Sequence, residues 1–154
     1  MPQPRSPFPA AVAAVLALTA SLAAQTSELF LMAGDQSTFN VIQGGVRVRS
    51  WSVAPGTAQY QYPIAVTNVI RTTGANVNEI GAMYDFLGTD LTLRYPHPAG
   101  TGRCWDGTTD GTNNYAIDTA GAVFRFQSDW TNPVLLFSVA TFGGITYDAT
   151  TNSL

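Results

Sequence analysis

The chain has 154 residues, which is room for about one ordinary domain. Only 11% of its residues are charged and 45% are hydrophobic, a composition that excludes a disordered tail. The net charge is −3 and there is no lysine, so no basic surface for nucleic acid is expected. The single cysteine excludes a disulfide framework within the chain and a metal site built from several cysteines.

Residues 1–24 have the pattern of a secretory signal peptide. Arg5 and the terminal amine supply positive charge, residues 10–22 form an apolar run, and the small residues Ala23 and Ala24 end it. The alternative is an uncleaved membrane anchor, but the apolar run is about 15 residues long and a spanning helix needs roughly 20. We therefore predict cleavage after Ala23 or Ala24 and a secreted, periplasmic or cell-surface product without a membrane span.

The rest of the chain, residues 25–154, has the pattern of β-strands separated by turns. Residues 46–51 alternate apolar and polar side chains, whereas residues 123–126 and 133–139 are apolar runs of strand length. Turn signals that contain glycine lie between these runs. They are Gly44-Gly45, Pro55-Gly56, Asp106-Gly107, Asp110-Gly111, Gly121 and Gly143-Gly144. The sequence therefore predicts an all-β domain, either a sandwich, a barrel or a propeller.

Two pairs of similar segments indicate an internal repeat. Residues 102–110 and 144–152 share a glycine, a large aromatic residue, Asp, two Thr and a final Asp or Asn, at an offset of 42 residues. Residues 39–45 resemble residues 115–121 at an offset of 76, and residues 83–90 contain a looser copy of the first turn. A period near 40 residues, with about four short strands per unit, is typical of a β-propeller blade.

One complete unit follows from this period. Its strands are expected at Gly102–Asp106, Tyr115–Asp118, Val123–Phe126 and Val134–Val139, and Gly144–Asp148 would open the next unit. The region 102–154 resembles the repeats of secreted bacterial β-propellers of the NHL, YVTN and streptogramin-lyase-like group. Blades of that group often read Gly-Ile-x-Tyr-Asp followed by an Asn-rich turn, as Gly144–Asp148 and Asn152–Leu154 do here. Ser27–Leu31 resembles the strand that would follow such a turn.

The resemblance implies about three antiparallel propeller blades between Leu29 and Leu154, and it carries over no catalytic residue. Propellers close with about four to eight blades, so we expect an incomplete ring that belongs to an N-terminal fragment of a longer propeller, truncated at its C-terminus. The alternative is a closed β-sandwich of about 130 residues, in which the repeat arises by chance because Asp-Gly and Thr-rich turns are common in all-β proteins.

The polar segment 106–114 is a candidate calcium loop, because oxygen-bearing side chains recur at alternate positions as they do in calcium-binding loops. The candidate ligands are Asp106, Thr108, Asp110 and Asn114. Ile117 occupies the position at which such a loop has a bidentate glutamate, so the match is incomplete. Asp and Asn also form tight turns without a metal. We therefore predict a structural turn without a cofactor, with calcium as the alternative.

His97 and Cys104 are the other side chains with reactive potential. His97 lies between two prolines, and no Gly-x-Ser-x-Gly turn supplies a nucleophile, so we interpret it as an exposed loop residue rather than a general base or metal ligand. It also lies outside the blade motif, so the histidine-centred site of the lyases has no clear counterpart here. Cys104 has no partner cysteine and is expected to be buried in a strand.

Seven aromatic residues could line a sugar-binding or peptide-binding face, although alternating aromatics on strands more often pack in a core or between blades. They are Trp51, Tyr60, Tyr62, Tyr95, Trp105, Trp130 and Tyr147. The acids Asp106 and Asp110 do not establish a glycosidase, because such enzymes need two carboxyl groups that face one sugar.

These patterns predict an exported, non-catalytic β-propeller repeat protein that binds an unknown protein or carbohydrate ligand or serves as a cell-surface scaffold. One alternative is a fragment of a propeller lyase or hydrolase whose active residues lie in missing blades. Another is a small β-sandwich module for carbohydrate binding or adhesion. No catalytic residue is assigned, no nucleic-acid partner is expected, and calcium is not expected to raise the melting temperature appreciably.

Overall fold

The computed structural model describes residues 27–35, 37–57, 60–141 and 143–154, so the predicted signal peptide lies outside the described residues. The described residues form eleven β-strands and no helix, which confirms the all-β prediction, and they accordingly include no helix that could cross a membrane. The strands are β1 (Glu28–Met32), β2 (Thr38–Gln43), β3 (Val46–Ser52), β4 (Ile64–Val66), β5 (Ile70–Thr72), β6 (Ile80–Tyr84), β7 (Asp90–Pro96), β8 (Cys104–Thr109), β9 (Asn113–Asp118), β10 (Ala122–Gln127) and β11 (Val134–Ser138).

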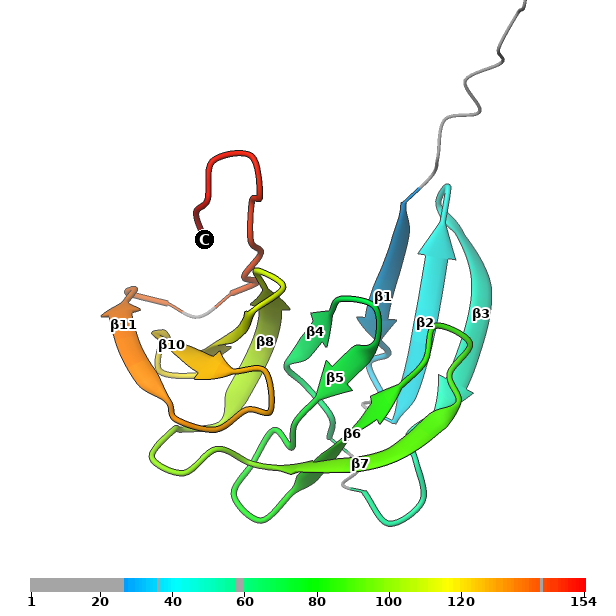
Figure 1. Cartoon of the computed structure of the whole chain (residues 1–154), viewed down its shortest axis with the longest axis horizontal. Helices are drawn as coiled ribbons and strands as arrows, with labels where there is room; N and C mark the ends of the chain where they lie inside the picture. Colours follow the sequence, from blue (N-terminus) through cyan, green and yellow to red (C-terminus); the bar gives the residue numbers. More distant parts are fainter. Residues whose placement is uncertain (1–26, 36, 58–59, 142) are drawn as a thin grey trace, which may run out of the picture.

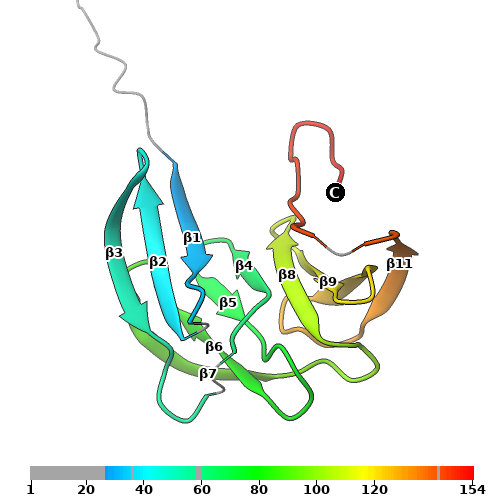
Figure 2. The ribbon, with the colours of Figure 1, turned by 180° about the vertical axis from the view of Figure 1, so that it is seen from behind.

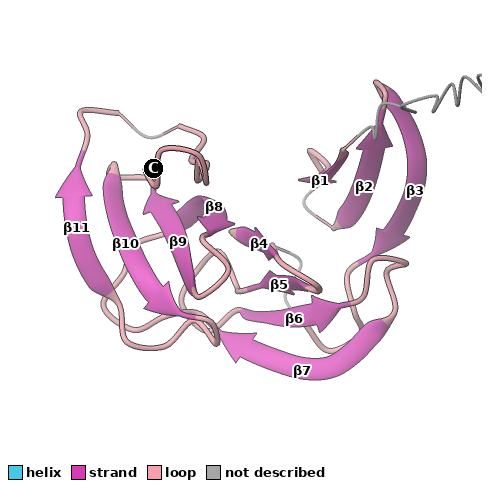
Figure 3. Ribbon diagram, turned by 45° about the horizontal axis from the view of Figure 1, so that its top comes forward, coloured by secondary structure: helices cyan, strands magenta, loops and turns pink. Residues whose placement is uncertain are grey.

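The strands form three antiparallel sheets, each from strands that are consecutive in the chain (Figures 1 and 2). The first sheet has the order β1-β2-β3, the second β4-β5-β6-β7, and the third β8-β9-β10-β11. Figure 3 shows the three sheets side by side in an open arc, with β1, β4 and β8 on the concave side and β3, β7 and β11 on the convex side. The described residues close neither a ring nor a barrel.

The first sheet follows directly from its sequence pattern. The alternating run at residues 46–51 lies within β3, and the predicted strand at Ser27–Leu31 corresponds to β1. Strands β2 and β3 are joined through Gly44 and Gly45, whose φ angles are 57° and 79°. A two-residue hairpin turn of type I′ needs positive φ at both central residues, a conformation that glycine adopts without steric cost.

The third sheet has the predicted four strands, but β8 differs from the expected strand Gly102–Asp106. It runs through Asp106 and Gly107 to Thr109, and the turn follows at Asp110. Gly107 is therefore not a turn residue, and the prediction of a turn at Asp106-Gly107 is wrong. A Cβ atom on this glycine would collide with Pro63, which precedes β4. The position needs glycine because the first strands of two sheets approach closely there.

The segment Gly144–Asp148 was expected to open a further unit, and it runs beside β8 without forming a strand. The backbone N–H of Ile145 donates to Asp106 Oδ2 at 2.8 Å, and that of Tyr147 donates to Thr108 Oγ1 at 3.2 Å. A turn then closes between Asp148 and Ser153. The residues that follow the aromatic position of the 42-residue repeat thus form a strand in one copy and a turn in the other.

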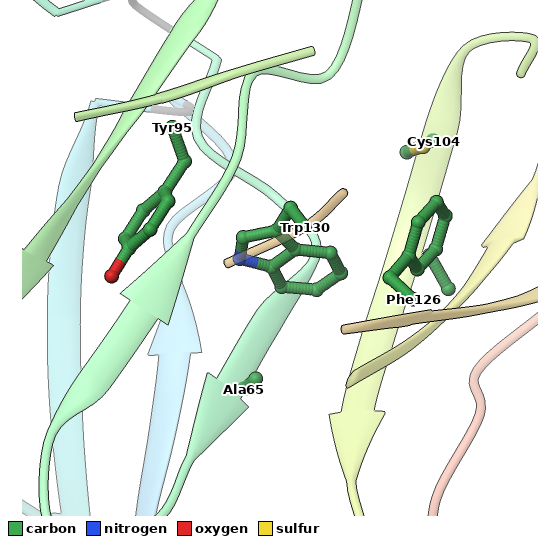
Figure 4. Packing of buried hydrophobic residues seen from close by; sticks show 6 residues of the cluster. Ala65, Tyr95, Cys104, Phe126 and Trp130 are labelled. Carbon is green, nitrogen blue, oxygen red and sulfur yellow. The ribbon is translucent and has the colours of Figure 1, made fainter. Parts of the chain in front are cut away.

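Side chains of the second sheet alternate between its two faces. One face packs on the first sheet and the other on the third, so two apolar interfaces hold the three sheets together. The first interface, between the first and second sheets, contains Phe30, Phe39, Trp51, Ile64, Ile70, Ala82 and Tyr84. The second interface, between the second and third sheets, contains Ala65, Met83, Tyr95, Cys104, Ala116, Phe126 and Trp130 (Figure 4). Phe39 is fully buried in the first interface, and Phe126 is 1% exposed in the second.

A buried polar network completes the first interface. Gln61 Oε1 accepts hydrogen bonds from Tyr84 Oη at 2.7 Å and from Thr72 Oγ1 at 3.0 Å. Tyr84 Oη in turn accepts the backbone N–H of Ala54 at 3.0 Å, and Gln61 Nε2 donates to Thr57. These hydrogen bonds join the connection between the two sheets to the core of the second sheet. The polar groups therefore satisfy one another inside the protein.

Candidate functional site

A cavity of about 480 Å³ lies where the first strands of the three sheets converge. Its lining consists of Phe30–Gly34 from β1 and the following turn, Tyr62, Ile64 and Val66 from the β4 region, Trp105–Thr109 from β8, and Gly144. These segments begin far apart in the sequence, and the arc of sheets brings them together. The volume falls within the range of small-molecule binding sites.

One side of the cavity is aromatic. Trp105 is 40% exposed and packs edge-on against Tyr62, with the ring centroids 5.8 Å apart. Arg103 Nη2 donates to Tyr62 Oη at 3.2 Å, and the Arg103 guanidinium lies 5.8 Å from the centroid of the Tyr60 ring. Arg103 thus orients both tyrosines, while Trp105 presents part of its ring to the cavity.

The other side is polar and comes from β8. Burial raises the pKa of Asp106, and the hydrogen bond from the backbone of Ile145 opposes that shift. Thr108 makes the second contact to the same passing segment through Tyr147. Asp106 and Thr108 therefore anchor the segment at the cavity, next to Gly144 in its lining.

The lining combines apolar and aromatic side chains with few charged groups. Asp106 is the only carboxylic acid among the described residues that line the cavity. General acid–base hydrolysis of a glycoside uses two carboxyl groups that flank the scissile bond. An apolar aromatic wall with a few convergent polar groups is typical of a site that orients a ligand.

The four candidate calcium ligands bind different parts of the protein. Asp106 and Thr108 contact the segment at Ile145 and Tyr147, as described above. Asn114 Nδ2 donates to the carbonyl oxygen of Ser128 at 3.1 Å, on the far side of a hairpin. Among the residues that the structure describes, no three His, Cys, Asp or Glu side chains gather into a group that could hold a metal ion.

Asp110, the remaining candidate, forms the turn between β8 and β9. Its Oδ1 accepts the backbone N–H groups of Thr112 at 2.7 Å and Asn113 at 2.6 Å, and its Oδ2 accepts Tyr115 Oη at 2.6 Å. Burial alone would raise the pKa of Asp110, but the hydrogen bonds outweigh it and lower the pKa to about 2. Burial and the bond to Asp110 raise the pKa of Tyr115 to about 12. The turn residues thus use this carboxylate as an acceptor.

His97 is half-buried, which differs from the exposed loop residue that the flanking prolines predict. Its Nδ1 lies 3.0 Å from the carbonyl oxygen of Gly74, and its Nε2 lies 3.1 Å from Thr101 Oγ1. A carbonyl oxygen only accepts, so Nδ1 carries the hydrogen in this arrangement. The ring joins the loop after β5 to the loop after β7, and it does not line the cavity.

Cys104 is completely buried in β8 within the second interface, as predicted. Burial raises the pKa of its thiol to about 12. A thiol in this environment remains protonated at neutral pH and is a poor nucleophile.

Most of the aromatic residues pack against other rings. Trp51 stacks on Phe39 with centroids 5.2 Å apart, and Trp130 packs on Phe126 at 5.5 Å. Trp105 and Tyr62 are the two of the seven predicted candidates that line the cavity. Sequence reasoning named these two residues but missed the contribution of β1 and β4, because no motif connects those strands to β8.

Comparison with protein-family models gives no match, and comparison with curated proteins gives none either.

Proposed function

We propose that this protein is an exported, non-catalytic β-propeller-type repeat protein that binds a ligand in the cavity between β1, β4 and β8. The observation that carries this proposal is the convergence of the first strands of three consecutive sheets on one cavity. These strands begin 36 and 40 residues apart, close to the period of the sequence repeat.

The propeller interpretation is supported by the order of the strands as well as by their spacing. Two four-stranded sheets and one three-stranded sheet follow one another, each with neighbouring strands paired in chain order. Propeller blades have this organisation, with the first strand of each blade nearest the central axis. A β-sandwich has two sheets, whereas the described residues form three.

The ligand class follows from the two sides of the cavity. The exposed part of Trp105 offers an apolar face, and the lining residues Asp106 and Thr108, which also bind the backbone at Ile145 and Tyr147, provide polar groups next to it on β8. A carbohydrate fits such a surface because its rings have apolar faces and a rim of hydroxyl groups. We therefore favour a carbohydrate over a protein ligand for this cavity.

Binding can be tested by calorimetry with a panel of soluble hexasaccharides of cellulose, xylan and chitin type. We expect at least one hexasaccharide to bind the protein, and we expect Trp105→Ala to weaken that binding by up to about tenfold, since an aromatic contact contributes about 0.5–1.5 kcal/mol. Leu87→Ala is the matched control, because Leu87 is 74% exposed and does not line the cavity.

Three outcomes would contradict the proposal. Binding of none of the three hexasaccharides, or equal binding by the Trp105→Ala variant, would show that the cavity is not a carbohydrate site. Release of reducing ends from a hexasaccharide would show that the protein is an enzyme. Export is tested separately, by the N-terminal sequence of the secreted product, which should begin at Ala24 or Gln25.

A further inference from the structure

Arg71 lies in the middle of β5 and points into the second interface. Its cross-strand neighbours are Ala65 on β4 and Met83 on β6, and both belong to the apolar cluster of that interface. Directly paired residues of antiparallel strands share one face of the sheet. The Arg71 guanidinium is therefore directed between the second and third sheets, where the residue is only 8% exposed.

The buried guanidinium lacks protein partners for two of its nitrogen atoms. Arg71 Nε and Nη2 are buried and have no hydrogen-bond acceptor. The two ion pairs among the described residues are elsewhere, between Arg49 and Glu28 and between Arg94 and Asp90. Arginine stays protonated in proteins, and a buried charge without a partner is strongly destabilising. Burial lowers the pKa of Arg71, because the loss of hydration disfavours the charged form of the guanidinium.

Two further orphaned polar atoms lie in the same interface. Trp130 Nε1 is buried without an acceptor, and Figure 4 shows the indole nitrogen on the side of the ring that faces Tyr95. Tyr95 interacts electrostatically with Arg71 and belongs to the same apolar cluster as Trp130. The other orphaned atom is Asn114 Oδ1, an acceptor on the strand residue that pairs with Phe126.

The carboxylates near the second interface accept hydrogen bonds from their own turns. Asp118 is buried opposite Cys104, and its Oδ1 accepts the backbone N–H groups of Ala120 and Ala122, each at 2.9 Å. Asp129 is the acid that influences Tyr95, but it is exposed and lies in the turn after β10. Its Oδ1 accepts Thr131 Oγ1 at 2.6 Å and the Thr131 backbone N–H at 3.1 Å. Arg71 therefore forms no ion pair with a carboxylate among the described residues.

We propose that a small monovalent anion, a halide or a carboxylate, binds between the second and third sheets against Arg71 and Trp130. The guanidinium supplies the charge and a planar pair of donors that suits a carboxylate, and the indole N–H supplies a further donor. Asn114 Oδ1 is left to accept a hydrogen bond from a water molecule at the edge of the site. This site is independent of the cavity between β1, β4 and β8.

The test compares the melting temperature of the protein in sodium chloride, bromide, formate and gluconate at equal ionic strength and pH. Gluconate serves as the reference because it is too large for a buried site. We expect the three small anions to raise the melting temperature by about 3 °C at about tenfold excess over the dissociation constant. A larger effect of formate than of the halides identifies a carboxylate as the preferred ligand.

Variants assign the effect to Arg71. Arg71→Met removes the charge at similar length and should abolish the anion dependence, whereas Arg47→Met, at an exposed arginine of β3, should retain it. Met83→Glu places a carboxylate opposite Arg71 and should abolish the dependence while the arginine remains. Bromide soaked into crystals should give an anomalous peak between Arg71 and Trp130.

An equal shift in the Arg71→Met protein would overturn the proposal, because the anions would then act elsewhere. The absence of any shift in the unaltered protein would also overturn it and would assign the orphaned donors to water. An anomalous peak only at surface positions would have the same meaning as an absent shift.

Discussion

The first and second interfaces are built by opposite faces of the same sheet, yet they treat buried polar groups differently. In the first interface, Gln61, Thr72 and Tyr84 satisfy one another through short hydrogen bonds. In the second interface, Arg71 and Trp130 keep donors without protein acceptors. One sheet of short strands therefore has a hydrogen-bonded polar network on one face and a buried guanidinium without an ion pair on the other, although Trp51 Nε1 in the first interface also lacks an acceptor.

The largest effect should come from truncating one matched aromatic ring in each interface. Phe39→Ala and Phe126→Ala remove side chains that are at most 1% exposed. Each should lower the free energy of unfolding by about 3–5 kcal/mol, because the lost contacts and the remaining cavity both destabilise the protein. Urea unfolding measures both changes. A loss below about 1 kcal/mol for either variant would show that its interface is not a packed core.

Removing one polar group from each interface should change the free energy of unfolding by different amounts in the two interfaces. Tyr84→Phe leaves the Ala54 N–H without its acceptor and removes one donor to Gln61 Oε1, and it should cost about 1–3 kcal/mol. Arg71→Met, measured in gluconate, should leave stability unchanged or raise it, because it removes a buried charge without a partner. Equal losses for the two variants would mean that Arg71 is satisfied within the protein, and the contrast between the interfaces would disappear.

The labelling rate of Cys104 tests whether the second interface is closed, and this experiment requires no change in the stability of the protein. Cys104 lies in the second interface and its pKa of about 12, raised by burial, keeps it protonated at pH 8. We expect it to react with a thiol reagent only as the second interface opens, at a rate that rises with urea. Val41→Cys, at a fully buried position of β2 and in a Cys104→Ala background, reports on the opening of the first sheet. Immediate labelling of Cys104 in native buffer would contradict the closed second interface.

The sequence analysis identifies several of the longer strands, but it misses the seven-residue strand β7 and the shortest strands. Residues 46–51 and 134–139 are expected as strands because alternation or apolar content marks them over more than five residues, and β3 and β11 lie there. Strands β4 and β5 have three residues each, which is too short for a period to appear. Within β5, Arg71 and Thr72 are buried, although their polarity predicts a solvent-exposed position. Tertiary packing overrides composition there.

The candidate site was predictable only in part. Trp105, Tyr62 and Asp106 were named from the sequence, but their convergence depends on how one sheet packs on the next. The same limitation explains the wrong turn at Gly107. The sequence shows a glycine after an aspartate, which is typical of a turn, whereas the deciding contact is with Pro63, more than forty residues earlier in the chain.

The chain order of the strands also has a consequence for how the protein folds. Each sheet pairs only strands that are neighbours along the chain, so its hydrogen bonds close short loops with a small entropy loss. A sheet can therefore form as soon as its own residues have been synthesised, before later segments exist. Each completed sheet then offers an apolar face on which the next one condenses, and the protein can grow by one folding unit at a time.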